Sequence, residues 1–357
     1  MEENKQHKTA LPATEHIPSA QAPEALLDIR GLRVEYHTDE DVVYAVNGLD
    51  LTIGKGESLG LVGETGAGKT TTALSVLRLI ADPPGKIMGG EIWFEGEDML
   101  QAKPARLREI RGSKISVIFQ DPMTSLNPVY SVGDQIAEVI HQHEKCSKEE
   151  GRRKAGDMLE MVGIPRARYD EYPHQFSGGM KQRVVIAMSI ACSPELILAD
   201  EPTTALDVTI QAQVLELMNE LKEKLRTSLL LITHDLGVVA QVCDRVAIMY
   251  AGEIVESGTI AEVFDHPHHP YTIGLFGSIP SLDETAEKLK PIQGQMPDPT
   301  ELPEGCAFAP RCPYATGACR TRKPEMTGVG GTQMVRCLAH QGVFESPELM
   351  EEVRHGR

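Results

Sequence analysis

The stretch that decides the fold is Gly63-Glu64-Thr65-Gly66-Ala67-Gly68-Lys69-Thr70. It fits the pattern GxxxxGK(S/T), in which a glycine-rich turn wraps the phosphates of a nucleotide. An apolar run at 58–62 predicts a buried strand before the turn, and 71–77 predicts the first turns of a helix after it. A purely structural glycine-rich turn is the alternative. The strand before the turn and the helix after it favour a phosphate-binding loop instead.

Two side chains of this loop carry the expected chemistry. Lys69 should reach the β and γ phosphates, and the Thr70 hydroxyl should ligate Mg²⁺. The glycines allow several backbone N–H groups to point at the phosphates, and the helix N-terminus adds its partial positive charge. We therefore expect the loop from Gly63 to Thr70, together with Thr71, to bind the nucleotide.

A second apolar strand ends in two carboxylates, which is typical of a Walker B element. Residues 196 to 201 read Leu-Ile-Leu-Ala-Asp-Glu. Asp200 at the end of this strand can hold Mg²⁺ through water, and Glu201 can polarise the attacking water as a general base. The two carboxylates predict nucleotide hydrolysis as well as nucleotide binding.

Between these two motifs, Ser177-Gly178-Gly179 open a helical run that continues through 184–188. Small residues at a helix N-terminus allow a phosphate to approach closely. Alone, this segment would be interpreted as an ordinary helix cap. Its position between a phosphate-binding loop and a Walker B strand favours a second phosphate-facing helix N-terminus.

In this order the motifs resemble those of the ATP-binding-cassette (ABC) ATPases, over residues from about 28 to 280. The resemblance implies that Gln120, at the end of an apolar strand, is the Q-loop glutamine, which senses Mg²⁺ and the attacking water. It implies that His234 is the switch histidine and that Asp207 belongs to the D-loop. Tyr36 resembles the aromatic residue that stacks on adenine.

The resemblance also implies a site shared between two subunits. In this family Ser177, Gly178 and Gly179 would contact the γ phosphate of ATP held by the partner subunit. Met180 departs from the glutamine that is usual in the family, which puts one polar contact in doubt. The expected partner is a second ABC ATPase subunit, either identical or homologous.

The fold class implied is α/β: a P-loop NTPase core with a RecA-like parallel sheet and an antiparallel β element. We expect a disordered tail at residues 1–24 and the ABC ATPase domain at 25–260, with a helical subdomain at about 121–176. The apolar stripe Val132, Ile136, Val139 and Ile140 supports that subdomain. Residues 261–357 should form a small, irregular, cysteine-rich C-terminal extension.

Two segments resemble the ATPase subunits of oligopeptide and dipeptide importers, including the related nickel importers. They are Gln120-Asp121-Pro122-Met123-Thr124-Ser125-Leu126-Asn127-Pro128 and His269-Pro270-Tyr271-Thr272. The resemblance implies that ATP hydrolysis powers peptide uptake across the cytoplasmic membrane. It also implies two transmembrane permease subunits and, indirectly, a solute-binding protein. The alternative for the first segment is a pair of Asx-Pro turns without a partner.

Composition and charge indicate where the chain works. The formal net charge is −17, which argues against a nucleic-acid partner, because phosphates would be repelled. No apolar run approaches the roughly 18 residues that span a bilayer, and the N-terminus lacks the order of a secretory signal. Both points indicate a soluble cytoplasmic protein. The resemblance to importer ATPases implies that it works as a peripheral protein on the cytoplasmic face of the cell membrane.

The extension contains four cysteines, Cys306, Cys312, Cys319 and Cys337. A reducing cytoplasm disfavours disulfides, and four thiolates suit zinc or an iron–sulfur cluster. The close CxxC pair of most zinc sites is missing, and the spacing alone leaves metal ligation and free thiols both open. The resemblance to peptide-importer ATPases implies a four-iron four-sulfur (4Fe-4S) cluster. A redox-sensing role that regulates the ATPase is a further possibility.

A soluble ABC ATPase of DNA repair or translation is the competing class of protein. The repair type carries a long coiled coil between the phosphate-binding loop and the signature segment, and no heptad run lies between Lys69 and Gln182. The translation type carries two cassettes in one chain, and this sequence contains one. The importer class therefore remains the favoured prediction.

Overall fold

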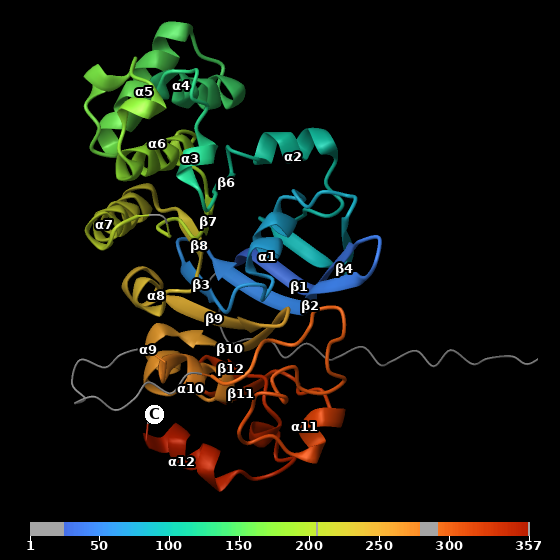
Figure 1. Ribbon diagram of the computed structural model, residues 1–357. Coiled ribbons are helices and arrows are strands. Elements are labelled where there is room, and N and C mark those ends of the chain that lie inside the picture. The colour runs from blue at the N-terminus through green and yellow to red at the C-terminus, as the bar shows by residue number, and fades with distance from the viewer. Residues whose placement is uncertain (1–24, 205, 279–291, 356–357) are drawn as a thin grey trace, which may run out of the picture.

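The structure is a computed structural model that describes residues 25–204, 206–278 and 292–355. The predicted tail at 1–24 lies outside the described residues. The molecule is elongated, with a helical region at one end, two sheets in the middle and the C-terminal extension at the other end (Figure 1). Within the described ranges, no helix is both long enough and apolar enough to cross a membrane.

The larger sheet has eight strands and forms the core. Its central strand β3 (Ser58–Val62) is buried at every position, as its apolar sequence predicts. Strands β9, β3, β8, β7 and β6 run parallel, and the remaining strands are antiparallel. The strand order is β11 (Thr327–Gly330), β12 (Gln333–Val335), β10 (Glu253–Thr259), β9 (Arg245–Tyr250), β3, β8 (Ser228–Thr233), β7 (Leu196–Asp200) and β6 (Ile115–Ile118).

A second, antiparallel sheet lies beside the core. Its order is β2 (Val42–Gly54), β1 (Ala25–His37), β4 (Gly85–Phe94) and β5 (Glu97–Asp98), which confirms the predicted antiparallel element. Helix α1 (Lys69–Val76) lies between the two sheets (Figure 1). One hydrophobic cluster joins these parts, because it contains residues of β1, β2, β3 and α1. The short helix α2 (Pro104–Ile110) follows the second sheet.

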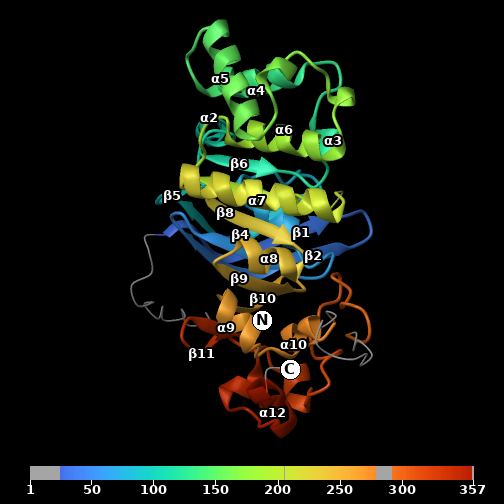
Figure 2. The same ribbon diagram turned by 90° about the vertical axis from the view of Figure 1, so that its left-hand side faces the viewer.

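Helices cover the other face of the core sheet. Helices α6 (Gly178–Ile190), α7 (Val208–Leu225) and α8 (Leu236–Val242) lie over that face (Figure 2). The helical region beyond them contains α3 (Pro122–Ser125), α4 (Val132–His143) and α5 (Lys148–Met161), followed by 3₁₀ turns at Arg166–Arg168 and Pro173–Gln175. Val132, Ile136 and Ile140 of the predicted stripe are fully buried. A helical segment is therefore present where the sequence predicted one.

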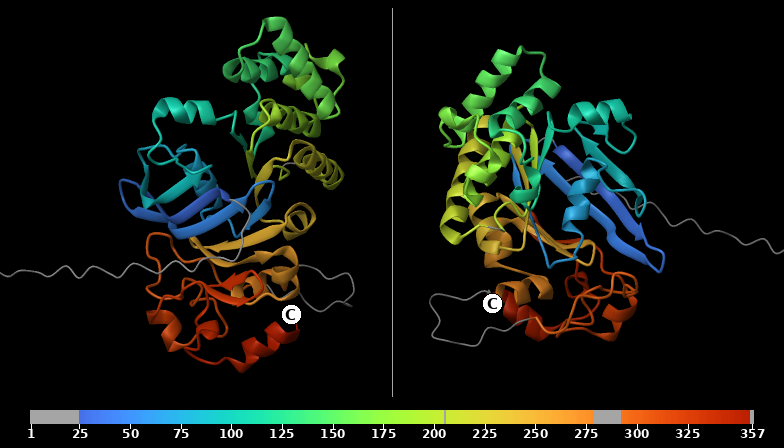
Figure 3. Two further views of the ribbon diagram at one scale, coloured as in Figure 1. Left: turned by 180° about the vertical axis from the view of Figure 1, so that it is seen from behind. Right: turned by 45° about the horizontal axis from the view of Figure 1, so that its top comes forward.

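The C-terminal extension is less separate than the sequence indicated. Strands β11 and β12 continue the core sheet, because Glu256 of β10 pairs with Val335 of β12. Its helices are α9 (Ile260–Asp265), α10 (Pro270–Phe276), α11 (Gly317–Thr321) and α12 (Pro347–His355), with a 3₁₀ turn at Leu338–Gln341. Viewed from behind, the extension closes one end of the molecule below the sheets (Figure 3). The extension and the cassette are thus joined by backbone pairing.

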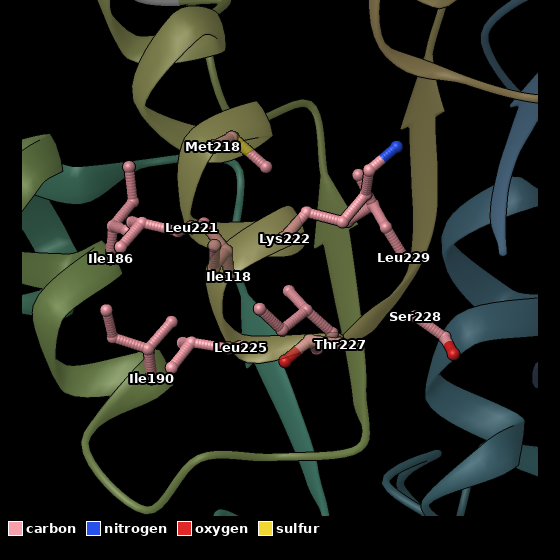
Figure 4. Close-up of a pocket in the computed structure, with 11 residues that line it drawn as sticks. Ile118, Ile186, Ile190, Met218, Leu221, Lys222, Leu225, Thr227, Ser228 and Leu229 are labelled. Atoms are coloured by element: carbon pink, nitrogen blue, oxygen red, sulfur yellow. The ribbon is translucent and has the colours of Figure 1, made fainter. Parts of the chain in front are cut away.

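A small cavity of about 20 Å³ lies between α6, α7 and the strands behind them (Figure 4). Its walls are mostly aliphatic, with Ile186, Leu221 and Leu225 among them. This volume is close to that of one water molecule. The cavity is therefore too small for a nucleotide.

Candidate ATP-hydrolysis site

The phosphate-binding loop connects β3 to α1 and is packed between two other strands. A side-chain carbon on Gly68 would lie 2.3 Å from the Ala45 carbonyl oxygen, and one on Gly63 would lie 2.2 Å from that of Met249. Gly68 also has φ of +103°, in the left-handed region that favours glycine, at the N-cap of α1. Both positions therefore require glycine if the loop is to keep this path.

Within the loop, Thr65 and Gly66 are exposed, whereas Ala67 is buried. The Lys69 ammonium donates hydrogen bonds to the Gly63 and Glu64 carbonyl oxygens at 2.7 and 3.0 Å. Burial lowers the pKa of Lys69, and the nearby acidic side chains act in the opposite direction. The loop thus holds the ammonium by two of its own carbonyl oxygens, at a place where a bound phosphate could accept its hydrogen bonds.

Asp200 and Thr70 come together at the end of β7. Burial raises the pKa of Asp200, and a hydrogen bond with the Thr70 side chain opposes this effect. A carboxylate and a hydroxyl are hard oxygen ligands of the type that Mg²⁺ prefers. These two residues therefore fit the predicted Mg²⁺ site. A bound Mg²⁺ would neutralise the charge that develops on the β and γ phosphates.

Glu201 is the centre of a hydrogen-bonded group. The Gln120 amide donates to its Oε2 at 2.9 Å, the Thr204 hydroxyl donates to the same oxygen at 2.9 Å, and His234 Nδ1 lies 3.1 Å from its Oε1. Glu201 has φ of +46°, just beyond the end of β7, and its N–H donates to the Ile232 carbonyl oxygen. The structure thus unites the three predicted catalytic residues Gln120, Glu201 and His234.

The protonation of Glu201 follows from these contacts. Burial acts to raise its pKa, but hydrogen bonds from His234 and Thr204 outweigh burial and hold the pKa of Glu201 below its usual range. The side chain therefore stays ionised at neutral pH. An ionised carboxylate beside the phosphate site can orient and polarise a water molecule for attack.

Tyr36 lies on β1 next to the phosphate-binding helix. Its hydroxyl is 3.2 Å from the Thr71 hydroxyl, in the first turn of α1. The tyrosine is half-buried. Tyr36 and Thr71, both predicted to bind the nucleotide, therefore lie in contact with each other.

The signature segment is not part of this group. Ser177 caps α6, since its hydroxyl accepts the Met180 N–H, and Ser177 and Gly178 are exposed. A side-chain carbon on Gly179 would lie 2.3 Å from Ile210 of α7, and Asp207 caps that same helix. Met180 Sδ, in place of the usual glutamine, accepts a hydrogen bond from Arg168. This segment contacts α6, α7 and Arg168, and its role toward a phosphate stays a prediction.

The four cysteines of the extension lie near one another. Burial raises the pKa of Cys312 and of Cys337 to about 12, and Cys306 and Cys319 act electrostatically on both. The Cys306 N–H donates to the Cys319 carbonyl oxygen at 2.8 Å. However, in the described ranges no three His, Cys, Asp or Glu side chains are arranged to hold a metal ion. The predicted iron–sulfur cluster therefore receives no support from this geometry.

Three residues that contact the site were not predicted from the sequence. Thr204 holds Glu201, and its position three residues after the Walker B glutamate was a usable signal. Tyr271 and Arg311 both contact Glu64 of the phosphate-binding loop. In the sequence, Tyr271 is marked only as part of a subfamily motif. No local pattern marks Arg311, because it is 247 positions from Glu64.

Comparison with known proteins agrees with this geometry. Residues 46–204 match the ABC transporter family, and residues 255–319 match the oligopeptide/dipeptide transporter C-terminal region. The ATP-binding cassette MJ0796, solved as a dimer in a post-hydrolysis state with ADP and Pi, superposes with a TM-score of 0.59 at 28% identity. That match covers 66% of this chain and 98% of MJ0796.

Two bacterial transport proteins are similar to this chain over most of its length. The oligopeptide transport ATP-binding protein OppD of Bacillus subtilis is 51% identical over 91% of this chain and 93% of its own length. AppD of the same organism is 49% identical over 88% of this chain and 97% of its own length. None of this favours the alternative classes of DNA repair or translation ATPases. This chain is an ATPase that belongs to the ATP-binding subunits of ABC transporters, within the group of oligopeptide and dipeptide transport proteins.

Proposed function

We propose that this chain hydrolyses ATP to drive peptide import across the cytoplasmic membrane, working on its cytoplasmic face as a peripheral subunit. The observation that carries the peptide cargo is the match of residues 255–319 to the oligopeptide/dipeptide transporter C-terminal region. The hydrolytic part is supported by the group of Gln120, Glu201 and His234 beside Lys69. Two relatives with about half of their residues identical are named as oligopeptide transport proteins.

The active complex contains two such cassettes. One chain would supply the Mg²⁺ ligands and the general base, while Ser177 and Gly178 of its signature segment are exposed and open to a partner. A second ABC ATPase subunit, identical or homologous, supplies Ser177, Gly178 and Gly179 or their equivalents. ATP then joins two cassettes, and hydrolysis releases them. The dimeric form of MJ0796 supports this arrangement.

Two transmembrane permease subunits dock beside Gln120. The proposal is supported by three exposed apolar side chains in that region: Phe119 is 48% exposed, Val129 is 72% exposed and Tyr130 is 54% exposed. The buried Gln135 supports the loop that carries Val129 and Tyr130, because its amide donates to the Asn127 and Tyr130 carbonyl oxygens. A fixed, exposed apolar surface is suited to a protein partner. Movement of the permease subunits would then shift Gln120, and with it the hydrogen bond that Gln120 donates to Glu201.

Peptide uptake tests the cargo. Cells that lack this subunit should fail to accumulate a radiolabelled tripeptide, and the wild-type chain should restore uptake whereas the Glu201→Gln variant should not. The solute-binding protein of the system should supply the peptide to the complex. Restored uptake of nickel, with peptide uptake unchanged, would refute the peptide assignment while leaving the ATPase intact.

Substitution of an exposed apolar residue tests the docking surface. Val129→Asp should prevent the permease subunits from co-purifying with this chain. Met88, an apolar residue of β4 that is 46% exposed, offers a matched control, and Met88→Asp should leave the complex intact. Equal recovery of permeases with both variants would contradict the proposed surface.

We also propose that Cys306, Cys312, Cys319 and Cys337 hold a 4Fe-4S cluster. The donor chemistry supports it, because four thiols of one segment are soft ligands of the type that iron–sulfur clusters use. The cluster would hold together a segment that is rich in proline.

Anaerobic purification tests the cluster. The protein should absorb broadly near ~400 nm and contain about four irons per chain. Cys312→Ser should lose the iron and make the extension sensitive to protease, while Cys192→Ser, outside the extension, should change neither. Iron-free protein with all four thiols open to alkylation would contradict the proposal without affecting the ATPase assignment.

A further inference from the structure

Glu64 of the phosphate-binding loop is held by the C-terminal extension at two points. Arg311 Nη1 donates to both carboxylate oxygens of Glu64 at 3.0 Å each. The Glu64 backbone N–H donates to the Tyr271 hydroxyl at 3.1 Å. Arg311 and Tyr271 both lie beyond residue 204, where the match to the general ABC transporter family ends. The extension therefore contacts the loop that binds the phosphates.

Arg311 is fixed in place from several sides. Its side chain is only 6% exposed, and its Nε donates to the Gln293 carbonyl oxygen at 3.0 Å. Its guanidinium carbon lies 5.8 Å from the ring centre of Tyr250 and 6.0 Å from that of Phe308. These two rings also pack edge to face on each other. A guanidinium held in this way can place its charge without losing much side-chain entropy on pairing.

The charge of Glu64 acts on the phosphate site. The Lys69 ammonium donates a hydrogen bond to the Glu64 carbonyl oxygen at 3.0 Å, so the two residues are in direct contact. Glu64 is thus close enough to influence the ammonium that receives the phosphates. Without a counter-charge, its carboxylate would repel the triphosphate that Lys69 attracts.

We propose that Arg311 is a positioning residue for ATP binding: it neutralises Glu64 and fixes the phosphate-binding loop, so that the C-terminal extension forms part of the nucleotide site. Arg311 acts through Glu64 and does not touch the reacting atoms. Cys312 follows Arg311 directly, and the N–H groups of both donate to the Phe308 carbonyl oxygen. The turn that carries two of the four cysteines therefore also sets the position of this guanidinium.

The test is a double-substitution cycle on the full-length chain, read out as equilibrium binding of MgATP. Arg311→Gln should weaken binding roughly tenfold, because the Glu64 charge is left uncompensated near the phosphates. Glu64→Gln should bind at least as tightly as wild type, and the combined variant should return to within roughly twofold of wild type. Arg311→Lys keeps the positive charge and should recover most of the affinity.

A matched control uses another arginine of the extension. Arg336 donates to the Ile254 carbonyl oxygen of the cassette but does not contact Glu64, so Arg336→Gln should bind MgATP like wild type. Normal binding by Arg311→Gln would overturn the proposal. So would a combined variant as weak as Arg311→Gln alone, since the effect would then be independent of the Glu64 charge. If Arg311→Gln does not fold, Arg311→Lys still tests the proposal, because weak MgATP binding by this charge-retaining variant would overturn it.

Discussion

Replacing Glu256 with glutamine should change how the stability of the protein depends on pH. Glu256 lies on β10 and is fully buried. Its carboxylate accepts the backbone N–H groups of His268 and His269 at 2.7 and 2.9 Å, and the Gln333 amide at 2.8 Å. One side chain thus joins the core sheet to β12 and to the start of α10, the helix that carries Tyr271.

The magnitude follows from the burial of this carboxylate. Burial raises the pKa of Glu256 from 4.5 to about 6, although its hydrogen bonds act in the opposite direction. A change of one in pKa corresponds to about 1.36 kcal/mol, so ionisation of Glu256 costs about 2 kcal/mol of folding free energy. The carboxyl group has the higher pKa in the folded state. The free energy of unfolding therefore includes this contribution in full below pH 4.5, where Glu256 is protonated, and loses it as the pH rises through about 6.

Urea denaturation of wild type and Glu256→Gln, followed by circular dichroism between about pH 4.5 and 7.5, measures the effect. The free energy of unfolding of the variant should gain about 2 kcal/mol relative to wild type across this range, because glutamine does not ionise. Glu262 provides the control: burial acts to raise its pKa, but hydrogen bonds from Thr332 and Thr259 hold it at about 2. Glu262→Gln should therefore differ from wild type by a constant amount over the same range. Parallel curves for Glu256→Gln and wild type would refute the reasoning.

Three further predictions concern catalysis. Glu201→Gln should retain MgATP binding but slow steady-state hydrolysis by the assembled complex roughly 10²-fold or more; an unchanged rate would remove Glu201 from the general-base role. Gly178→Asp should abolish hydrolysis by the pair yet leave MgATP binding by the isolated chain intact, because the nearest neighbour of the new side-chain carbon is Leu206 at 3.8 Å. Loss of binding by the isolated chain would mean that Gly178 acts in its own site. Thr204→Ala should raise the pKa of Glu201 and move the acid limb of the pH–rate profile to higher pH, and an unmoved limb would contradict the role given to this hydrogen bond.

The parts of the fold that sequence could predict are those with a local cause. The buried strand, the glycine-rich turn and the helix that follow one another at residues 58–76 each have a distinct pattern, and all three are present. Asp200 and Glu201 lie at the end of β7, as predicted, because the apolar run of the strand stops where these two charged residues begin. The grouping of Glu201 with Gln120 and His234 came from the family resemblance, since these residues are far apart in the chain.

Other features had no local signal. Strands β11 and β12 are four and three residues long, and the first contains two glycines, so neither has the alternation that marks a strand. They are strands because β10 offers a free edge of the core sheet. The contact of Arg311 with Glu64 likewise depends on the whole chain, because an arginine in a proline-rich segment is normally a solvated surface residue. Contacts between residues far apart in the sequence therefore determine both the two short strands and the Arg311–Glu64 pair.

Charge explains why the extension lies against the phosphate-binding loop. The chain has a formal net charge of −17, and Glu64, Asp200 and Glu201 all act electrostatically on Lys69. A triphosphate that enters this region meets the N-terminus of α1 and Lys69 as favourable groups and three carboxylates as unfavourable ones. Mg²⁺ can offset Asp200 and Glu201, which lie at the metal side of the site, whereas Glu64 lies on the opposite end of the loop. Its compensation has to come from the protein itself, and Arg311 of the extension supplies a cation in direct contact with it.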